Sequence, residues 1–328
     1  MTSRLAAVAA YAGVSEATVS RVLHDKPGVA RATRDAVLTA LDVFGFPRPR
    51  PVRGERARLI GLVLPDLSNP VFPAFADVIG VSLAQRGLVP VLCTRTSDGV
   101  SEAHYIQMLL ASQVGGIIFV GSSFADAGDE QARQLTERRL PMVLINAADE
   151  NLGVPQVGID ERAAVEQAVG HLTGLGHERI GLILGPWGHV PSMRKLVGFK
   201  RSQDLVEHTV FSMEGGRAAA LRLLDRGVTG LVCASDALAL GAIRAVRRKG
   251  LSVPGDVSVV GFDDSAFMGV TDPPLTTMRQ PVREMAAAAV SSLLAQLDGR
   301  LLVSDEITFD PELIVRATTA PCAAMQTK

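Results

Sequence analysis

The stretch Ala12–Leu23, A-G-V-S-E-A-T-V-S-R-V-L, carries side chains that can read DNA bases. Gly13 is expected to end one helix, and the Ser15 hydroxyl to cap the next by accepting a backbone N–H. Helical spacing places three apolar residues on one buried face: Val19, Val22 and Leu23. The opposite face carries small, polar or basic residues: Glu16, Ala17, Ser20, Arg21 and His24. A short helix with such a face fits the major groove.

The residue types on that face suit two kinds of DNA contact. Arginine can pair with guanine through two hydrogen bonds, so Arg21 is expected to read a base edge. Hydroxyls, and an imidazole just past the helix end, suit phosphate oxygens. The expected phosphate contacts are Ser15, Thr18, Ser20 and His24. Periodicity alone leaves open an ordinary amphipathic helix of a globular domain, and the surrounding sequence favours the DNA-reading interpretation.

Three short helices are expected to position this stretch, over residues 4–12, 15–24 and 31–44. They form a helix-turn-helix domain, residues 1–45, whose middle helix presents the reading face. Residues 46–58, F-P-R-P-R-P-V-R-G-E-R-A-R, follow as a proline-rich hinge or linker that cannot form a regular helix. Arg48 and Arg50 are expected to lie along phosphates, although a solvated tether without a DNA role fits the same composition.

Basic residues are concentrated in this N-terminal part of the chain. Residues 1–58 hold ten Lys/Arg against five Asp/Glu, whereas the remaining residues hold 23 against 29. A basic head on an acidic body is typical of a DNA-binding module joined to a second function. The three cysteines are unclustered, and no apolar run is long enough to cross a membrane. The sequence therefore predicts a cytoplasmic protein with no metal site and no cofactor.

From residue 59 to the C-terminus, an effector-binding core with alternating strands and helices is expected. Expected strands cover 59–64, 88–94, 116–120, 142–146, 155–160, 180–184, 229–233 and 257–261. Expected helices cover 73–86, 101–112, 128–139, 161–174, 191–202, 214–226 and 236–249. This alternation predicts an α/β core of two doubly wound, parallel-sheet lobes. Ligands of such sheets bind at the carboxyl ends of the strands, so a cleft between the lobes is the expected site.

Seven segments, in order along nearly the whole chain, resemble the LacI family of sugar- and purine-responsive transcription regulators. They are A-G-V-S-E-A-T-V-S-R-V-L, I-G-L-V-L-P-D-L-S-N-P-V-F, G-G-I-I-F-V, L-G-H-E-R-I-G-L, S-D-A-L-A-L-G-A-I-R-A, V-P-G-D-V-S-V-V-G-F-D-D and P-P-L-T-T-M-R-Q-P. Within the family, the chain is most similar to the maltose-operon repressors. R-K-L-V-G-F, E-G-G-R-A-A-A and F-D-P-E-L-I-V-R-A-T-T carry that finer resemblance.

The resemblance implies a periplasmic-binding-protein-like core in which the chain crosses three times between the lobes. One lobe would contain residues 59–160 with about 281–310, and the other residues 161–280 with about 311–320. It also implies a homodimer that binds a near-palindromic double-stranded operator and a small sugar effector, such as maltose or a malto-oligosaccharide. The leading interpretation is a sequence-specific DNA-binding regulator that acts as a repressor. The alternative is a cytosolic sugar-binding protein without specific DNA recognition.

The resemblance also assigns roles to residues. Glu16 and Ala17 stand where family members first read bases, Phe72 where a ring stacks on the ligand, and Asp263 where a carboxylate grips it. The family's ligand arginine is replaced by Lys195, with Arg194 beside it. Further effector candidates are residues that follow strands or stand at crossovers: Asp66, Ser68, Asp160, Trp187, Ser235, Asp236 and Gln280. Trp187 could equally lie on the surface, and Asp236 could simply cap its helix and support the cleft.

The sequence departs from the family pattern at two places. The hinge is short and proline-rich, and an asparagine usual before it is not matched, which puts leucine insertion into the minor groove in doubt. The stretch Phe199–Phe211 is about a dozen residues shorter than usual, either by deletion or because residues are missing from the sequence. No phosphate loop, dinucleotide glycine motif or nucleophile elbow is present, so no catalytic residue is assigned and an enzyme is not expected.

Overall fold

The computed structural model describes residues 4–23, 28–44, 58–94, 101–121, 128–147, 153–300 and 306–322. The chain divides into two compact units. The first is Met1–Arg58 with Ala84–Val89, and the second is Leu59–Leu83 with Pro90–Lys328. Among the described residues, no helix combines the length and apolar character needed to cross a membrane.

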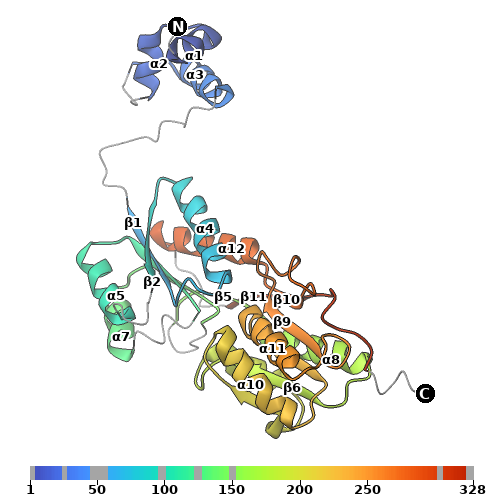
Figure 1. Cartoon of the computed structure of the whole chain (residues 1–328). Coiled ribbons are helices and arrows are strands. Elements are labelled where there is room, and N and C mark those ends of the chain that lie inside the picture. Colours follow the sequence, from blue (N-terminus) through green and yellow to red (C-terminus); the bar gives the residue numbers. More distant parts are fainter. Residues whose placement is uncertain are drawn as a thin grey trace. The chain divides into compact units, whose positions relative to one another are not determined.

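The N-terminal unit contains a three-helix bundle (Figure 1). Its helices are α1 (Arg4–Ala12), α2 (Glu16–Leu23) and α3 (Arg31–Val43). Gly13 has φ 65°, a left-handed conformation that turns the chain between α1 and α2 at little cost because glycine lacks a Cβ. The bundle is held by a small apolar core of Val8, Ala9, Val19, Val22, Val37, Ala40 and Leu41. Burial of Val19 and Val22 fixes which face of α2 points outward.

The first lobe of the core is built on a six-stranded sheet of order β11-β5-β4-β3-β1-β2. Its strands are β1 (Leu59–Leu64), β2 (Val89–Thr94), β3 (Gly116–Val120), β4 (Met142–Ile145), β5 (Gln156–Ile159) and β11 (Glu306–Phe309). Its helices are α4 (Val71–Ala84), α5 (Glu102–Ala111), α7 (Asp129–Glu137) and α12 (Val282–Leu297). In Figure 1, α5 and α7 lie on one side of the sheet, and α4 and α12 on the other.

The second lobe has a sheet of order β12-β10-β9-β8-β6-β7, in which only the β10–β12 pair is antiparallel among the pairings of the described residues. Its strands are β6 (Ile180–Leu184), β7 (Val206–His208), β8 (Gly230–Cys233), β9 (Ser258–Asp263), β10 (Thr276–Arg279) and β12 (Glu312–Ile314). Its helices are α8 (Glu161–Gly174), α9 (Val190–Gly198), α10 (Met213–Asp225) and α11 (Asp236–Arg248).

The chain passes between the two lobes three times. The crossings follow β5, β10 and β11, so that α12 packs on β3, β4 and β5 although it comes late in the sequence. The expected fold, a helix-turn-helix domain followed by two doubly wound lobes, is confirmed.

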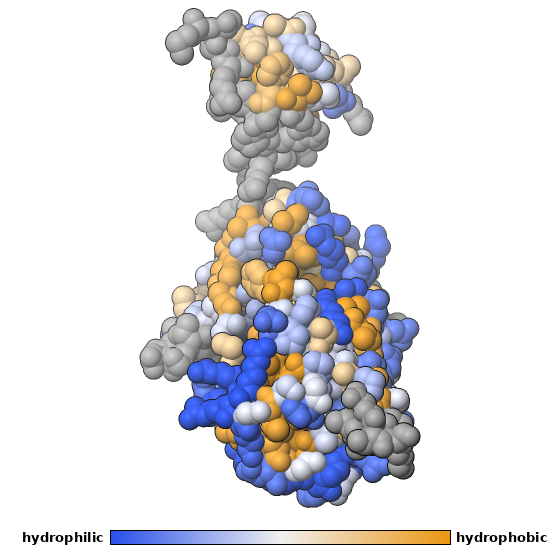
Figure 2. Space-filling model, turned by 45° about the vertical axis from the view of Figure 1, so that its right-hand side comes forward, coloured by the Kyte–Doolittle hydropathy of each residue, from blue (hydrophilic) through white to orange (hydrophobic). Residues whose placement is uncertain are grey.

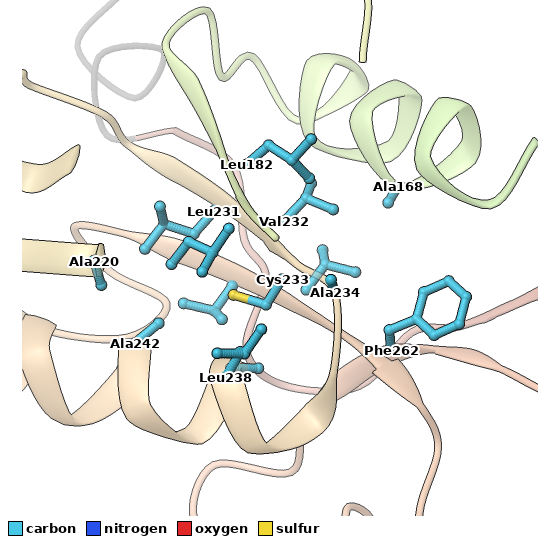
Figure 3. Packing of buried hydrophobic residues seen from close by; sticks show 14 of the residues in the cluster. Ala168, Leu182, Ala220, Leu231, Val232, Cys233, Ala234, Leu238, Ala242 and Phe262 are labelled. Atoms are coloured by element: carbon cyan, nitrogen blue, oxygen red, sulfur yellow. The ribbon is translucent and has the colours of Figure 1, made fainter. Parts of the chain in front are cut away.

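The second lobe has an extensive apolar core. Figure 3 shows Leu231 and Cys233 of β8 pointing toward the helix that carries Leu238 and Ala242, while Val232 points to the opposite face. This alternation is the two-residue period of a strand covered on both faces. Helices α10 and α11 approach closely at Gly216 and Gly241. A Cβ at either glycine would collide with backbone atoms of the facing helix.

The segment after α9 differs from the expectation. The helix expected over 191–202 ends at Gly198, because Phe199 turns inward and is buried. A Cβ at Gly198 would also collide with the backbone of Arg162. A single 3-10 turn, Gln203–Leu205, then leads into β7, a strand that the sequence did not predict. Three residues with one apolar member are too short to show strand alternation, and pairing with β6 defines them.

Candidate functional site

The outer face of α2 presents the predicted base-reading residues. Glu16, Ala17 and Arg21 are exposed, whereas Thr18 and Ser20 are half-buried. The Ser15 Oγ accepts the backbone N–H of Thr18 at 3.2 Å and lies 3.0 Å from the Thr18 hydroxyl. Ser15 is therefore the N-cap of α2, which orients the helix that a major groove would receive. His24, Arg48 and Arg50 lie outside the described residues.

A buried carboxylate of the second lobe, Asp263, contacts the first lobe. It ends β9 with φ 113°, a backbone conformation that residues other than glycine rarely adopt and that occurs often at ligand sites. Its Oδ1 accepts from the Gln280 Nε2 at 2.5 Å, and its Oδ2 accepts from the Asn69 Nδ2 at 3.3 Å. Burial, together with the nearby carboxylate of Asp236, raises the pKa of Asp263 well above its usual range. A hydroxyl-rich ligand could satisfy such a group.

Asp236 is a second buried carboxylate near Asp263, and it helps to position the residues around it. It is buried at the start of α11, where the Ser235 Oγ caps the helix by accepting the Leu238 N–H at 3.2 Å. The Asp236 carboxylate accepts from the Thr277 hydroxyl at 2.6 Å, and from the backbone and hydroxyl of Ser265 at 2.8 and 2.6 Å. Burial raises the pKa of Asp236 to about 6. These bonds tie the loop after β9 to α11 and β10, so Ser235 and Asp236 position the neighbourhood of Asp263.

Two basic residues of α9 already have acidic partners. The buried Lys195 Nζ donates to the carboxylate of Glu161 and lies 3.6 Å from the centroid of the Phe262 ring. Burial is the main cause that raises the pKa of Glu161, and the Lys195 ammonium opposes it. The Arg194 guanidinium donates two hydrogen bonds, of 2.6 and 3.1 Å, to the carboxylate of Glu306 in β11. Because Glu306 belongs to the first lobe, this pair connects the lobes.

The remaining predicted residues make contacts that stabilise local structure. The Asp66 Oδ1 accepts from the backbone of Ser68 at 2.7 Å, from its hydroxyl at 2.6 Å and from the backbone of Asn69 at 3.1 Å. This turn fixes Asn69 opposite Asp263. The Asp160 Oδ1 caps α8 by accepting the N–H of Ala163 at 2.8 Å. Phe72, half-buried in the first turn of α4, lies against Gly121 at the end of β3.

Asn146 is a cleft residue that the sequence analysis did not single out. It follows β4 with φ 54°, and its Nδ2 donates to the Gln280 Oε1 at 2.7 Å. Its Oδ1 is buried without a hydrogen-bond partner among the described residues. A small cavity that is partly open to solvent lies here, lined by Asn146, Gly158, Ile159, Glu161, Val190, Pro191 and Arg194. The rule that ligands meet strand ends could have found Asn146, because it ends an expected strand.

Four rings lie at the carboxyl ends of β6 and β7. The indole of Trp187 stacks on the imidazole of His208, with ring centroids 3.7 Å apart and planes inclined by 21°. His189 meets Phe211 edge to face, with centroids 4.9 Å apart. The His189 Nδ1 also caps α9 by accepting the Ser192 N–H at 3.3 Å. Burial is the main cause that lowers the pKa of His189 to about 4, which keeps the ring neutral for this role.

Comparisons with known proteins bear on the whole chain. Residues 4–48 match the model of bacterial regulatory proteins of the lacI family, and residues 169–319 match the periplasmic binding protein-like domain. The HTH-type transcriptional regulator reg1 of Streptomyces lividans is 50% identical, over 98% of this chain and 97% of that protein. MalR of Streptomyces coelicolor is 49% identical over the same shares. The chain belongs to the LacI family.

LacI-family membership is also visible in the fold. The CelR–cellobiose complex superposes with a TM-score of 0.71 at 30% identity, over 96% of this chain and 99% of that one. The lac repressor dimer bound to operator and the anti-inducer ONPF gives 0.72 at 27% identity, over 97% and 99%. The chain is thus a transcriptional regulator and not an enzyme. The resemblance noted in the sequence is confirmed, while the roles of individual site residues stay predictions.

Proposed function

We propose that this LacI-family regulator is a repressor whose affinity for its operator is controlled by a small sugar bound between the two lobes. The observation that carries the proposal is the contact of Asn69 with Asp263 across the cleft. A ligand that replaces the amide donors at Asp263 changes how the lobes meet. The core can transmit this change in relative lobe position to the DNA-binding domain. The CelR complex with cellobiose supports a sugar as the ligand of such a core.

The chemistry of the cleft favours a polyhydroxylated ligand. Asp263 and the Oδ1 of Asn146 can accept from hydroxyls, Gln280 can donate to them, and Phe72 offers a ring near the same strand ends. Maltose or a malto-oligosaccharide is the effector we propose, and the similarity to a regulator named MalR supports that choice. Lys195 would act through Glu161 and Phe262, because its ammonium is already engaged.

The DNA-binding part of the proposal rests on α2. Arg21, Glu16 and Ala17 would read bases, while Ser15, Thr18 and Ser20 would contact phosphates together with three residues outside the described ranges: His24, Arg48 and Arg50. We assign the helix-turn-helix domain to residues 1–45, the hinge to residues 46–58 and the effector-binding core to residues 59–328. A regulator of this kind acts on DNA in the cytoplasm.

A homodimer would present two copies of α2 to half-sites about one helical turn apart, which requires a near-palindromic double-stranded operator. The lac repressor dimer bound to operator supports this arrangement. Exposed apolar side chains on the first lobe, such as Val81 of α4 and Leu92 of β2, offer surface to a second copy. Figure 2 shows hydrophobic patches among hydrophilic residues on one face of the molecule.

Selection of bound duplexes from a random DNA pool, at two salt concentrations, tests the proposal. We expect a near-palindromic consensus that binds at least about a thousandfold tighter than random DNA. Maltose and maltotriose are then titrated into the complex with the selected duplex, and we expect them to change its dissociation constant. Weak binding with a steep salt dependence and no consensus would favour the alternative, a sugar-binding protein with a nonspecific basic head.

A further inference from the structure

Trp187 presents one open ring face at the surface of the second lobe. Its other face is covered by the stacked imidazole of His208, and the residue is 71% exposed. His208 is itself anchored, because its Nδ1 donates to the Gly185 carbonyl at 2.9 Å. Trp187 is the only tryptophan in the chain. The result is a flat, apolar surface that is held in place before any ligand arrives.

A series of contacts connects this surface to residues that line the cleft cavity. Val190 and Pro191 of α9 line the cavity, and His189 immediately precedes them. His189 contacts Phe211, and the Phe211 ring fills the space beside Gly185, where a Cβ would collide with it. Gly185 in turn holds His208, on which Trp187 stacks. The four ring residues all lie at or after the carboxyl ends of β6 and β7.

The size of the cavity limits what it can hold. The space inside it that water can reach is about 10 Å³, which is room for about one water molecule. A sugar of several rings therefore extends beyond it. The apolar C–H face of a pyranose ring is complementary to an exposed aromatic face, and burying both surfaces is favourable.

We propose that Trp187, backed by His208, is an outer subsite that stacks on a later ring of a linear oligosaccharide whose first ring binds in the cleft. The effector is then an oligosaccharide, and affinity rises with the number of rings until Trp187 is covered. This inference rests on the proposed function, because it assumes that a sugar binds in the cleft.

The test is calorimetric titration of the full-length protein with glucose, maltose, maltotriose and maltotetraose, in parallel with tryptophan fluorescence. Trp187→Ala, Trp187→Phe and a control, Met108→Ala, are compared with the unaltered protein. Met108 is 52% exposed on α5 of the first lobe. Thermal melting checks that each variant is folded. Because Trp187 is the only tryptophan, its emission reports directly on contact with the longer sugars.

We expect Trp187→Ala to weaken binding of the longest sugars about tenfold. For the shortest sugar with measurable affinity, the loss should be less than about twofold. Trp187→Phe should keep most of the affinity, and Met108→Ala all of it. Longer sugars, but not the shortest, should shift the emission of the unaltered protein.

The possible failures are distinguishable. Affinity that does not rise with length, or an equal loss for all lengths in Trp187→Ala, would overturn the outer subsite and leave the proposed function standing. Unchanged affinities in that variant would do the same. Failure of every sugar to bind the unaltered protein would overturn the proposed function itself, and the subsite with it.

Discussion

The side-chain amide of Asn69 donates to the carboxylate of Asp263, with Nδ2 and Oδ2 3.3 Å apart, although 194 positions separate the two residues. Asn69 follows the first strand of one lobe, and Asp263 ends a central strand of the other. Arg194 and Glu306 form a second contact between the lobes beside the crossovers. The cleft is thus closed by polar contacts, which a ligand with its own hydrogen-bonding groups can exchange.

Asp263→Asn tests the central carboxylate. The amide keeps the shape but replaces one acceptor oxygen with a donor, which then faces the amide donor of either Asn69 or Gln280. We expect maltose or maltotriose to bind about 10- to 100-fold more weakly by calorimetry, because hydrogen bonds to charged groups contribute about 1.5–3 kcal/mol. Asp225→Asn removes a carboxylate at the end of α10, and should leave sugar affinity unchanged. Equal affinities for both variants would remove Asp263 from the binding site.

Arg21→Ala tests the separation of DNA reading from sugar binding. Each arginine–guanine pair contributes about 1–3 kcal/mol, and a dimer carries two, so operator affinity should fall at least about 30-fold in an anisotropy titration. Sugar affinity should not change. Arg222→Ala is the matched control, since it removes an arginine from the core surface. A loss of sugar binding in Arg21→Ala would contradict the division of functions between the two units.

Lys195→Met tests the buried ion pair. The substitution leaves the Glu161 carboxylate buried without its partner, which should reduce the free energy of unfolding by about 3–5 kcal/mol in a denaturant titration. The double variant Lys195→Met/Glu161→Gln should recover most of that loss. Lys200→Met, which opens an exposed pair with Glu166, should cost about 1 kcal/mol or less. A similar small loss for Lys195→Met would show that the pair is not desolvated.

His189→Asn tests the neutral imidazole at the start of α9. The pKa of His189 falls from 6.5 to about 4 in the folded protein, so between these values the unfolded chain binds more protons. The free energy of unfolding therefore rises by up to about 3 kcal/mol as the pH rises across this window. This contribution is lost again as the pH falls from about 6.5 to 4. Asparagine also caps helices but does not titrate. The unaltered protein should thus lose more stability than His189→Asn on acidification, and parallel profiles would contradict this.

The elements that the sequence predicted are those whose pattern is local. The three N-terminal helices were found to within a residue or two, because Gly13, Ser15 and the spacing of buried valines mark them. Strand β7 was missed, since pairing with β6 and not its own composition defines it. The partners Asn69 and Asp263, or Lys195 and Glu161, are distant in sequence, and only the doubly wound topology brings them together. Family resemblance pointed to Asp263 and Lys195 but not to Asn69 or Glu161.

The most direct test of the account is the affinity of the full-length protein for its selected operator, measured by fluorescence anisotropy without sugar and with saturating maltotriose. Coupling between distant sites is typically about 1–3 kcal/mol, so the dissociation constant should change about 5- to 150-fold. By linkage, the operator should change the affinity for maltotriose by the same factor. If maltotriose binds and the operator affinity stays the same, the cleft does not control DNA binding, and the proposed regulation is wrong.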